Sequence, residues 1–266
     1  MLNREYRAEL IRKYARSTED DELLARLLDK VDIHDRSGLM QHSRFLSERD
    51  RLCCEPVLRE LGVEAVFWGG YAEAERTVLI LPADWQDPVQ CAQGSSSPVA
   101  VLRAAFREEE SLSHRDFLGA LMGLGIERDL VGDIIPSAGS CDMVLIREIL
   151  PFVQQNLSSA GRVPLTLTEI PQAEAREAEF RLIRDTVASV RLDAVVGCGF
   201  CLSREKAASA IRSGRVFLNG MECLKPDKPV EAGTRISLRG LGKIELCEIG
   251  GQSRKGRTQI VIKRFV

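Results

Sequence analysis

The stretch "LSREKAASAIRSGRVFLNG", residues 202–220, decides the fold of the C-terminal part of this chain. Ser203 stands where a helix begins, because its hydroxyl accepts a hydrogen bond from a backbone N–H of the first turn. Gly214 stands where a left-handed residue ends a helix. The run "VFL" then leads into Asn219-Gly220, the strongest two-residue hairpin signal. The stretch therefore predicts a short helix followed directly by a β-hairpin.

Apolar side chains indicate what this helix packs against. Ala207, Ala208 and Ile211 form a small apolar face, which suits close packing against another helix. The preceding segment supplies that partner with four apolar residues at helical spacing: Leu192, Val195, Val196 and Phe200. A pair of short packed helices is therefore expected.

The polar side chains of the stretch suggest a function. Arg204 and Arg212 lie roughly 80° apart around a helix with 3.6 residues per turn, while Lys206 flanks them and Arg215 follows the glycine. Phosphate oxygens suit such a cluster, because Arg grips them in a bidentate manner. The alternative is a solvated helix face with ion pairs to Glu205. On the first interpretation, reversing Arg204 and Arg212 to Glu abolishes most binding to the phosphate-bearing partner without unfolding the chain.

The charge distribution favours the same interpretation. The formal net charge of the 266 residues is −2, but residues 186–266 hold 15 Lys/Arg against 7 Asp/Glu. The rest of the chain is acidic, with 22 basic and 32 acidic residues. A basic end on a nearly neutral protein indicates a polyanionic partner for that end.

Composition places the chain among ordinary soluble globular proteins. Its hydrophobic fraction is 44% and its charged fraction 29%, and the longest apolar runs are far too short to span a membrane. The N-terminus has no apolar segment typical of a secretory signal. The eight cysteines show no disulfide-framework spacing, which favours free thiols. We expect a cytoplasmic monomer with no membrane association.

Periodicity divides the chain into four segments and indicates an α+β fold. Residues 1–62 form a helical N-terminal region, with apolar residues three and four apart and a helix from Ser47 to Gly62. Residues 63–171 form a small α/β domain with helices on one face of a sheet. Residues 172–188 are a connector that includes a candidate strand. Residues 189–266 form the two-helix domain, with a small sheet and a β-rich tail.

Within the α/β domain, the local patterns identify individual elements. The runs "VEAVFWGG", "TVLILP" and "VAVLRAAF" predict strands, and "DWQDPVQCAQGSSSP" predicts a loop between the last two. Ser113 and Asp116 have capping-box spacing at the start of "SHRDFLGALMGLG" and predict a helix over residues 113–125. His114 and Arg115 lie in its first turn, where they offer a secondary RNA contact.

Two motifs that suggest catalysis or metal binding lack the residues they need. Cys198 and Cys201 have C-x-x-C spacing, but a structural zinc requires four ligands and no second pair is present. His114-Arg115-Asp116 imitates a kinase catalytic loop, yet Leu121 occupies the place of the magnesium-binding Asn. We therefore expect no catalytic residue, no metal and no cofactor.

A longer pattern resembles the RNA-binding domain named after ribosomal protein S-four. The matching segments are "RLDAVV", the stretch 202–220 and "KPDKPVEAGTRISL", about 60 residues in all. The resemblance implies two helices on a small sheet, with the second helix and the following loop lying on structured RNA. It assigns RNA contact to eight residues: Ser203, Arg204, Lys206, Arg212, Ser213, Gly214, Arg215 and Asn219. Thr234 departs from the Asp that is usual in the family.

Three further segments resemble the YlmH family, which includes cyanobacterial and plastid members labelled photosystem II domain proteins. They are "FWGGYAEAER", "SHRDFLGALMGLGIERDLVGDI" and "ISLRGLGKIELCEIGGQSRKGRTQIVIKRF". The resemblance implies a non-enzymatic RNA-binding protein whose middle domain also contacts RNA. It implies association with the large ribosomal subunit and tRNA in handling stalled translation. It adds five loop cations to the candidate site: Arg239, Lys243, Arg254, Lys255 and Arg257.

Other functions remain open at this point. An RNA-modifying enzyme of the pseudouridine synthase type is suggested by Arg191-Leu192-Asp193, but only about 70 residues follow. A methyltransferase would need a glycine-rich cofactor loop after a strand, and the sequence shows no such loop. If the chain is instead a photosystem or protein-assembly factor, we expect an apolar surface for a protein partner and binding that does not depend on salt. The acidic N-terminal helices are expected either to dock a protein partner or to cover the sheet.

Overall fold

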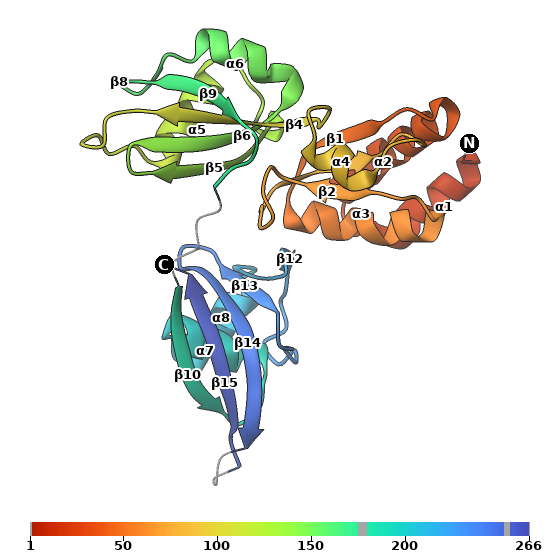
Figure 1. The fold of residues 1–266 in the computed structure, drawn as a ribbon. Helices are drawn as coiled ribbons and strands as arrows, with labels where there is room; N and C mark the ends of the chain where they lie inside the picture. Colours follow the sequence, from red (N-terminus) through yellow and green to blue (C-terminus); the bar gives the residue numbers. More distant parts are fainter. Residues whose placement is uncertain (1, 175–179, 253–255, 266) are drawn as a thin grey trace. The chain divides into compact units, whose positions relative to one another are not determined.

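The computed structural model in Figure 1 describes residues 2–174, 180–252 and 256–265. Its contacts divide the chain into two compact units, residues 1–176 and 177–266. Each unit combines helices with antiparallel strands, which confirms the α+β prediction. In the part of the chain that the structure describes, no helix is long and apolar enough to cross a membrane.

The first unit begins with helices packed on a three-stranded sheet. The strands are ordered β1-β3-β2 and are antiparallel. Their bounds are Gln41–Leu46 for β1, Val66–Trp68 for β2 and Thr77–Leu81 for β3. The helices are α1 (Arg4–Tyr14), α2 (Thr18–Ser37), α3 (Glu48–Leu61) and α4 (Pro88–Gln93). Leu79 and Leu81 pack against α1–α3 on one face, whereas Val78 and Ile80 enter a second core that includes α4.

Two local predictions in this region are wrong. Residues 41–46, placed in the helical region, form β1, because pairing with the buried strand β3 supplies backbone hydrogen bonds that the local sequence does not indicate. The expected limit between residues 62 and 63 therefore falls inside one hydrogen-bonded sheet. The expected loop contains α4, which Asp87 caps through the Gln90 N–H and Pro88 opens at its first position.

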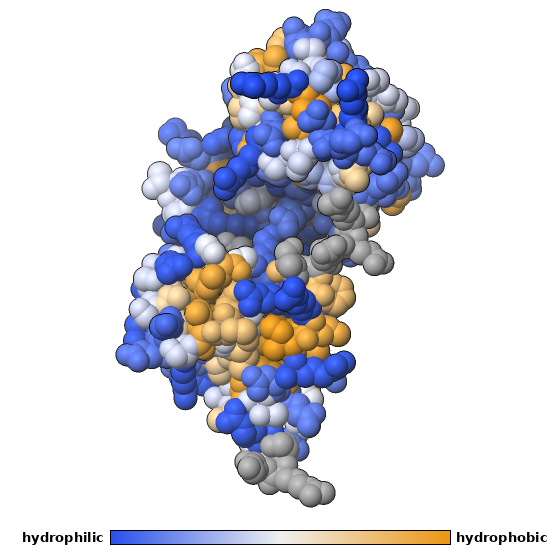
Figure 2. Space-filling model, turned by 90° about the vertical axis from the view of Figure 1, so that its left-hand side faces the viewer, coloured by the Kyte–Doolittle hydropathy of each residue, from blue (hydrophilic) through white to orange (hydrophobic). Residues whose placement is uncertain are grey.

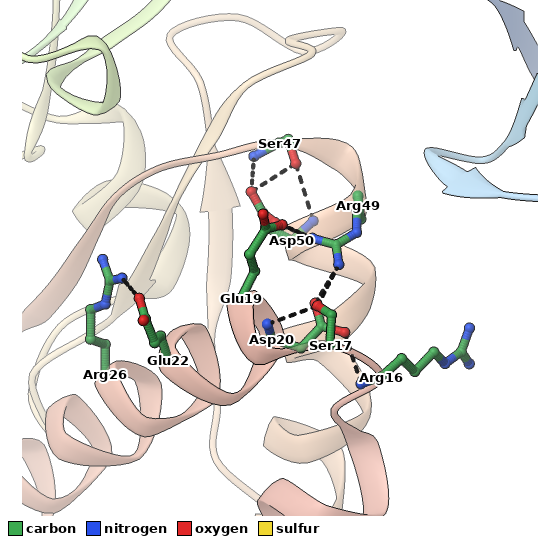
Figure 3. A network of polar contacts seen from close by, with 9 residues as sticks. All are labelled: Arg16, Ser17, Glu19, Asp20, Glu22, Arg26, Ser47, Arg49 and Asp50. Atoms are coloured by element: carbon green, nitrogen blue, oxygen red, sulfur yellow. Dashed lines mark hydrogen bonds and ion pairs between the residues drawn. The ribbon is translucent and has the colours of Figure 1, made fainter. Parts of the chain in front are cut away.

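Figure 3 shows how the starts of α2 and α3 are tied together. Ser17 caps α2, and Ser47 caps α3 in a capping box with Asp50. The Arg49 guanidinium lies between the two caps, 2.6 Å from the buried Asp20 carboxylate and 3.2 Å from the Ser17 hydroxyl. One arginine therefore stabilises both helix starts and their packing.

Replacing Arg49 with Met is expected to lower the free energy of unfolding of the first unit by about 1–3 kcal/mol. The reason is that the buried Asp20 carboxylate loses its cation. The chain's two tryptophans, Trp68 and Trp85, both lie in this unit, so their fluorescence during urea unfolding reports the change. Arg26→Met removes an exposed pair with Glu22 and is the matched control, with an expected effect below about 0.5 kcal/mol. Equal effects of the two variants would contradict the assignment.

The rest of the first unit is built on a four-stranded sheet ordered β5-β6-β4-β9. Its strands are β4 (Val99–Ala105), β5 (Val131–Ser137), β6 (Ser140–Ile146) and β9 (Thr166–Ile170). The short elements around it are η1 (Arg128–Leu130), η2 (Arg147–Ile149), β7 (Ser159–Ala160) and β8 (Val163–Pro164). Helices α5 (His114–Gly123) and α6 (Leu150–Asn156) share a core with one face through Phe117, Leu121 and Val153. The other face sends Val101 and Val144 into the core shared with the first sheet.

The helix expected over residues 113–125 is confirmed as α5. Ser113 and Asp116 form the expected capping box, with the Asp116 carboxylate accepting from the Ser113 N–H and hydroxyl at 2.8 and 2.7 Å. These bonds stabilise the ionised form, and the pKa of Asp116 lies below its usual value. The first turn that carries His114 and Arg115 is thus fixed by the sequence itself.

The second unit is a six-stranded antiparallel sheet with two helices on one face, ordered β10-β15-β14-β13-β11-β12. Its strands are β10 (Phe180–Val187), β11 (Val216–Leu218), β12 (Met221–Glu222), β13 (Arg235–Leu238), β14 (Gly242–Gln252) and β15 (Thr258–Phe265). Its helices are α7 (Leu192–Phe200) and α8 (Arg204–Arg212). Strand β10 pairs with β15 over its whole length. The expected connector, residues 172–188, therefore contains strand β10 of this sheet.

The core of this unit confirms the expected packing of two short helices. Leu192, Val196 and Phe200 of α7 are buried together with Ala207 and Ile211 of α8. The inward residues of the central strands, such as Ile236, Ile244, Leu246 and Ile262, complete the cluster. The small side chains on α8 allow close approach, so the helix pair is held by its apolar faces and its polar faces remain available.

Strand β10 forms one edge of this sheet and carries exposed apolar side chains. Phe180 and Leu182 are 45% and 48% exposed, and the Lys263 ammonium lies 5.0 Å from the Phe180 ring centroid. Figure 2 shows apolar residues gathered across this side of the unit. The cation over the ring covers part of the apolar surface.

Candidate nucleic-acid interface

The segment 202–220 folds as its sequence predicts. The Ser203 hydroxyl caps α8 by accepting from the Lys206 N–H at 3.3 Å. Gly214 has φ +69°, a left-handed backbone conformation that favours glycine at this helix end. Asn219 and Gly220 both have positive φ, 47° and 77°, as the hairpin turn requires. The cap, the helix end and the turn together fix where the basic side chains leave the backbone.

A depression of about 280 Å³ lies between α8 and the turn that joins β13 to β14. Three residues of α8 and the segment following it form its polar edge: Lys206, Ser209 and Ser213. Arg215 adds a further cation. Its apolar lining consists of Leu202, Ala210, Leu238 and Leu241. Three of the predicted RNA-contacting residues therefore meet at one concave surface.

Arg215 is oriented at this surface by hydrogen bonds with Arg239. Its guanidinium donates to the Arg239 carbonyl at 2.9 Å, and its own carbonyl accepts from the Arg239 N–H at 3.0 Å. The Arg239 guanidinium in turn stacks on the Phe217 ring, 4.8 Å from its centroid. The two arginines are thus oriented before any ligand arrives, which lowers the entropy lost on binding.

Lys206 and Arg212 are exposed on α8. Among the residues that the structure describes, neither side chain has a hydrogen-bond or ion-pair partner. A charged group without a protein partner keeps its full capacity for phosphate oxygens. These two residues are the strongest candidates for phosphate contacts.

Arg204 forms an ion pair that the sequence did not predict, while its contact with RNA stays a prediction. Its guanidinium donates to the carboxylate of Asp193 on α7 at 3.0 Å, and Arg191 contacts the same carboxylate at 3.1 Å. Asp193 is only 4% exposed, so Arg204 helps to neutralise a buried charge. Reversing Arg204 would place two carboxylates together and destabilise the helix pair. The proposed Arg204/Arg212 reversal is therefore not a clean test of RNA binding.

Two other predicted contacts take part in the local structure. The Asn219 side-chain oxygen accepts from the Arg235 N–H at 2.8 Å, and the Ser213 hydroxyl donates to the Ala210 carbonyl at 3.0 Å. Each bond leaves part of the group's capacity unused: the Asn219 amide N–H₂ and the Ser213 lone pairs. Their contact with RNA stays a prediction.

The candidate cations of the tail are spread over the sheet. Lys243 is half-buried on β14, opposite Ser237 of β13. The Arg257 guanidinium donates to the hydroxyl of Thr186 at 3.0 Å and to its carbonyl, which ties the start of β15 to β10. Arg254 and Lys255 lie outside the described residues. Neither Lys243 nor Arg257 lines the depression.

His114 and Arg115 belong to the first unit, where both are exposed in the first turn of α5. Their RNA contact stays a prediction.

Cys198, the first cysteine of the C-x-x-C pair, does not have the lowered pKa of a redox-active thiol. Cys198 lies in the last turn of α7, and burial raises its pKa to about 12. Redox-active cysteines require a lowered pKa, because the thiolate is the nucleophile. Over the described residues, no group of three or more His, Cys, Asp or Glu side chains is placed to hold a metal ion.

Five residues that line the depression were not among the predicted site residues, and Ser209 and Leu241 are two of them. Ser209 lies three positions after Lys206, on the same face of the helix, so helical spacing from Lys206 and Ser213 would have indicated it. Leu241 stands in the turn "RGLGK", where only the cations were considered. Its position beside α8 depends on the pairing of β13 with β14.

Family models of RNA-binding domains match one segment in each of the two units. Residues 106–174 match the family model described as "Putative RNA-binding domain in YlmH", and residues 190–236 match that of the S4 domain. The chain is 30% identical over 230 residues to "Ribosome-associated protein quality control protein P2" of Bacillus subtilis, which covers 85% of this chain and 87% of that protein. The structure of "Cell division protein ylmH from Streptococcus pneumoniae" aligns with a TM-score of 0.51 at 20% identity. That alignment covers 59% of this chain and 94% of the other, and supports the fold.

Proposed function

Because this chain belongs to the YlmH family of RNA-binding proteins, we propose that it docks without catalysis on structured RNA of the large ribosomal subunit. Ribosomal RNA, tRNA or both are the proposed ligands, and the handling of stalled translation is the proposed context. The relative from Bacillus subtilis, described as a ribosome-associated quality control protein, supports this context.

The observation that carries the proposal is the pair of cations on α8, Lys206 and Arg212, beside a third that is fixed by its neighbours, Arg215. Exposed cations on and just after one short helix suit the phosphates of folded RNA, which proteins recognise by shape and backbone contacts. Exposed His114 and Arg115 on α5 are proposed as a secondary contact from the first unit.

A specific observation weighs against the pseudouridine synthase alternative. Asp193, the residue that imitates a catalytic aspartate, is buried and its carboxylate accepts bonds from Arg191 and Arg204. A catalytic carboxylate must reach its substrate. The assignment of Asp193 to the core of the RNA-binding domain supports a binding role.

Sedimentation with purified ribosomal subunits tests the proposal. The full chain is expected to co-migrate with the large subunit at low salt and to dissociate as salt rises, since counterion release weakens binding. The variant Lys206→Glu/Arg212→Glu is expected to remain at the top of the gradient. Failure of the wild-type chain to co-migrate at any salt concentration would overturn the ribosomal assignment. Binding that is insensitive to salt would favour a protein-assembly role.

A further inference from the structure

The depression beside α8 has an apolar lining that phosphate binding does not require. Half-buried Leu202 and Leu241, which is 40% exposed in the turn at the edge, present this apolar surface, while Ala210 and Leu238 belong to the buried core beneath them. Phosphate contacts need only cations and N–H or O–H donors. Apolar side chains among such groups indicate a ligand with an apolar surface as well as a charge.

The size of the depression restricts that ligand. A volume of about 280 Å³ lies just below the range of about 300–1,000 Å³ typical of small-molecule sites. It has room for one small planar group, whereas a double helix cannot enter. A base in a paired stem is stacked between its neighbours, but an unpaired base is free to leave the stack.

The polar groups around the depression fit a nucleotide. The Lys206 ammonium is available for its phosphate. The Arg215 guanidinium, fixed by the Arg239 carbonyl, offers a flat cation on which a base stacks. Ser209 and Ser213 line the same space, and hydroxyl groups suit the polar edge of a base.

We propose that this depression receives the base of one unpaired nucleotide of the bound RNA, with the adjoining phosphate on Lys206. The inference rests on the proposed RNA-binding function and deepens it. It makes the chain selective for folded RNA that carries a bulged or flipped nucleotide, beyond the general attraction of cations to phosphates.

Two RNA hairpins test the proposal, one fully paired and one identical except for a single bulged nucleotide. Fluorescence anisotropy measures the affinity of the full chain for each. The wild-type chain is expected to bind the bulged hairpin about tenfold more tightly, or better, because stacking adds to the phosphate contacts. Ser209→Trp fills the depression while keeping every cation, and is expected to reduce the ratio to about one by lowering the affinity for the bulged hairpin more than that for the paired one.

Two further variants test whether the loss of preference for the bulged hairpin comes from filling the depression. Glu205→Trp places the same bulk on another exposed part of α8 and is expected to keep the wild-type ratio. Leu241→Glu changes an exposed turn residue and is expected to lower affinity for the bulged hairpin more than for the paired one. It serves in place of Ser209→Trp if circular dichroism shows that variant unfolded.

The outcomes distinguish the two proposals. A preference for the bulged hairpin that survives both Ser209→Trp and Leu241→Glu overturns the base site. Equal affinity of the wild-type chain for both hairpins, lost in Lys206→Glu/Arg212→Glu, overturns the base site and leaves RNA docking intact. Absence of binding to either hairpin and to ribosomal subunits overturns both.

Discussion

Replacing Lys206 and Arg212 together with glutamate is expected to lower the affinity for RNA by about 100-fold or more at 0.1 M salt. Two phosphate contacts are lost and two carboxylates then repel the backbone, and charge-assisted hydrogen bonds contribute about 1.5–3 kcal/mol each. Because each neutralised phosphate releases counterions, the slope of log affinity against log salt is expected to fall by about two. Anisotropy titrations at several salt concentrations measure both quantities.

Arg12→Glu/Arg26→Glu is the matched control, since it changes the net charge equally with exposed residues of α1 and α2. Its salt slope is expected to equal that of the wild-type chain. Thermal unfolding of Lys206→Glu/Arg212→Glu should resemble that of the wild-type chain, because both side chains are exposed. A folded variant that retains the wild-type slope would remove these residues from the interface.

Replacing Asp193 with Ala is expected to have the largest effect on stability, about 2–4 kcal/mol. The buried carboxylate accepts from Arg191, Arg204 and the Ala194 N–H, and its loss leaves the two guanidinium groups without their shared anion. Breaking a fully buried pair costs about 3–5 kcal/mol, and the solvent exposure of the arginines reduces that figure. Hydrogen exchange of the amides in α7 and α8 measures the change within the second unit.

Two variants test whether the effect comes from this cluster. Asp227→Ala removes an exposed carboxylate of the same unit and is expected to change amide protection little. Arg204→Ala is expected to cost only about 1 kcal/mol, because its side chain is 65% exposed. A loss for Arg204→Ala equal to that of Asp193→Ala would show that Arg191 does not share the carboxylate.

The ion pair of Arg204 shows that a basic sequence motif does not reveal which of its cations has a partner within the protein. In the sequence, Arg204 and Arg212 are equivalent cations of one helix. The structure separates them, because Arg204 begins α8 beside the buried Asp193 whereas Arg212 ends the helix in solvent. Only the crossing of α7 and α8 decides which arginine is paired. Helical spacing by itself does not contain that information.

The first unit shows the same division between local and tertiary information. The helix from Ser113 is determined locally, since a capping box and apolar spacing act over a few residues. Strand β1 is not, because "QHSRFL" acquires its strand structure by pairing with β3, some 35 residues later. The sheet formed by β1, β2 and β3 therefore extends across the domain boundary that periodicity indicated at residue 62.

The sequence by itself determined the helix–hairpin segment 202–220, the basic character of the C-terminal unit and the resemblance to RNA-binding proteins. Caps, glycines with positive φ and apolar spacing are short-range requirements, and a single segment satisfies them. Tertiary structure alone decided that Leu241 faces α8, that Arg239 fixes Arg215 and that Asp193 binds Arg204. Each of these contacts joins residues 11 to 35 positions apart, so it exists only once the helices pack on the sheet.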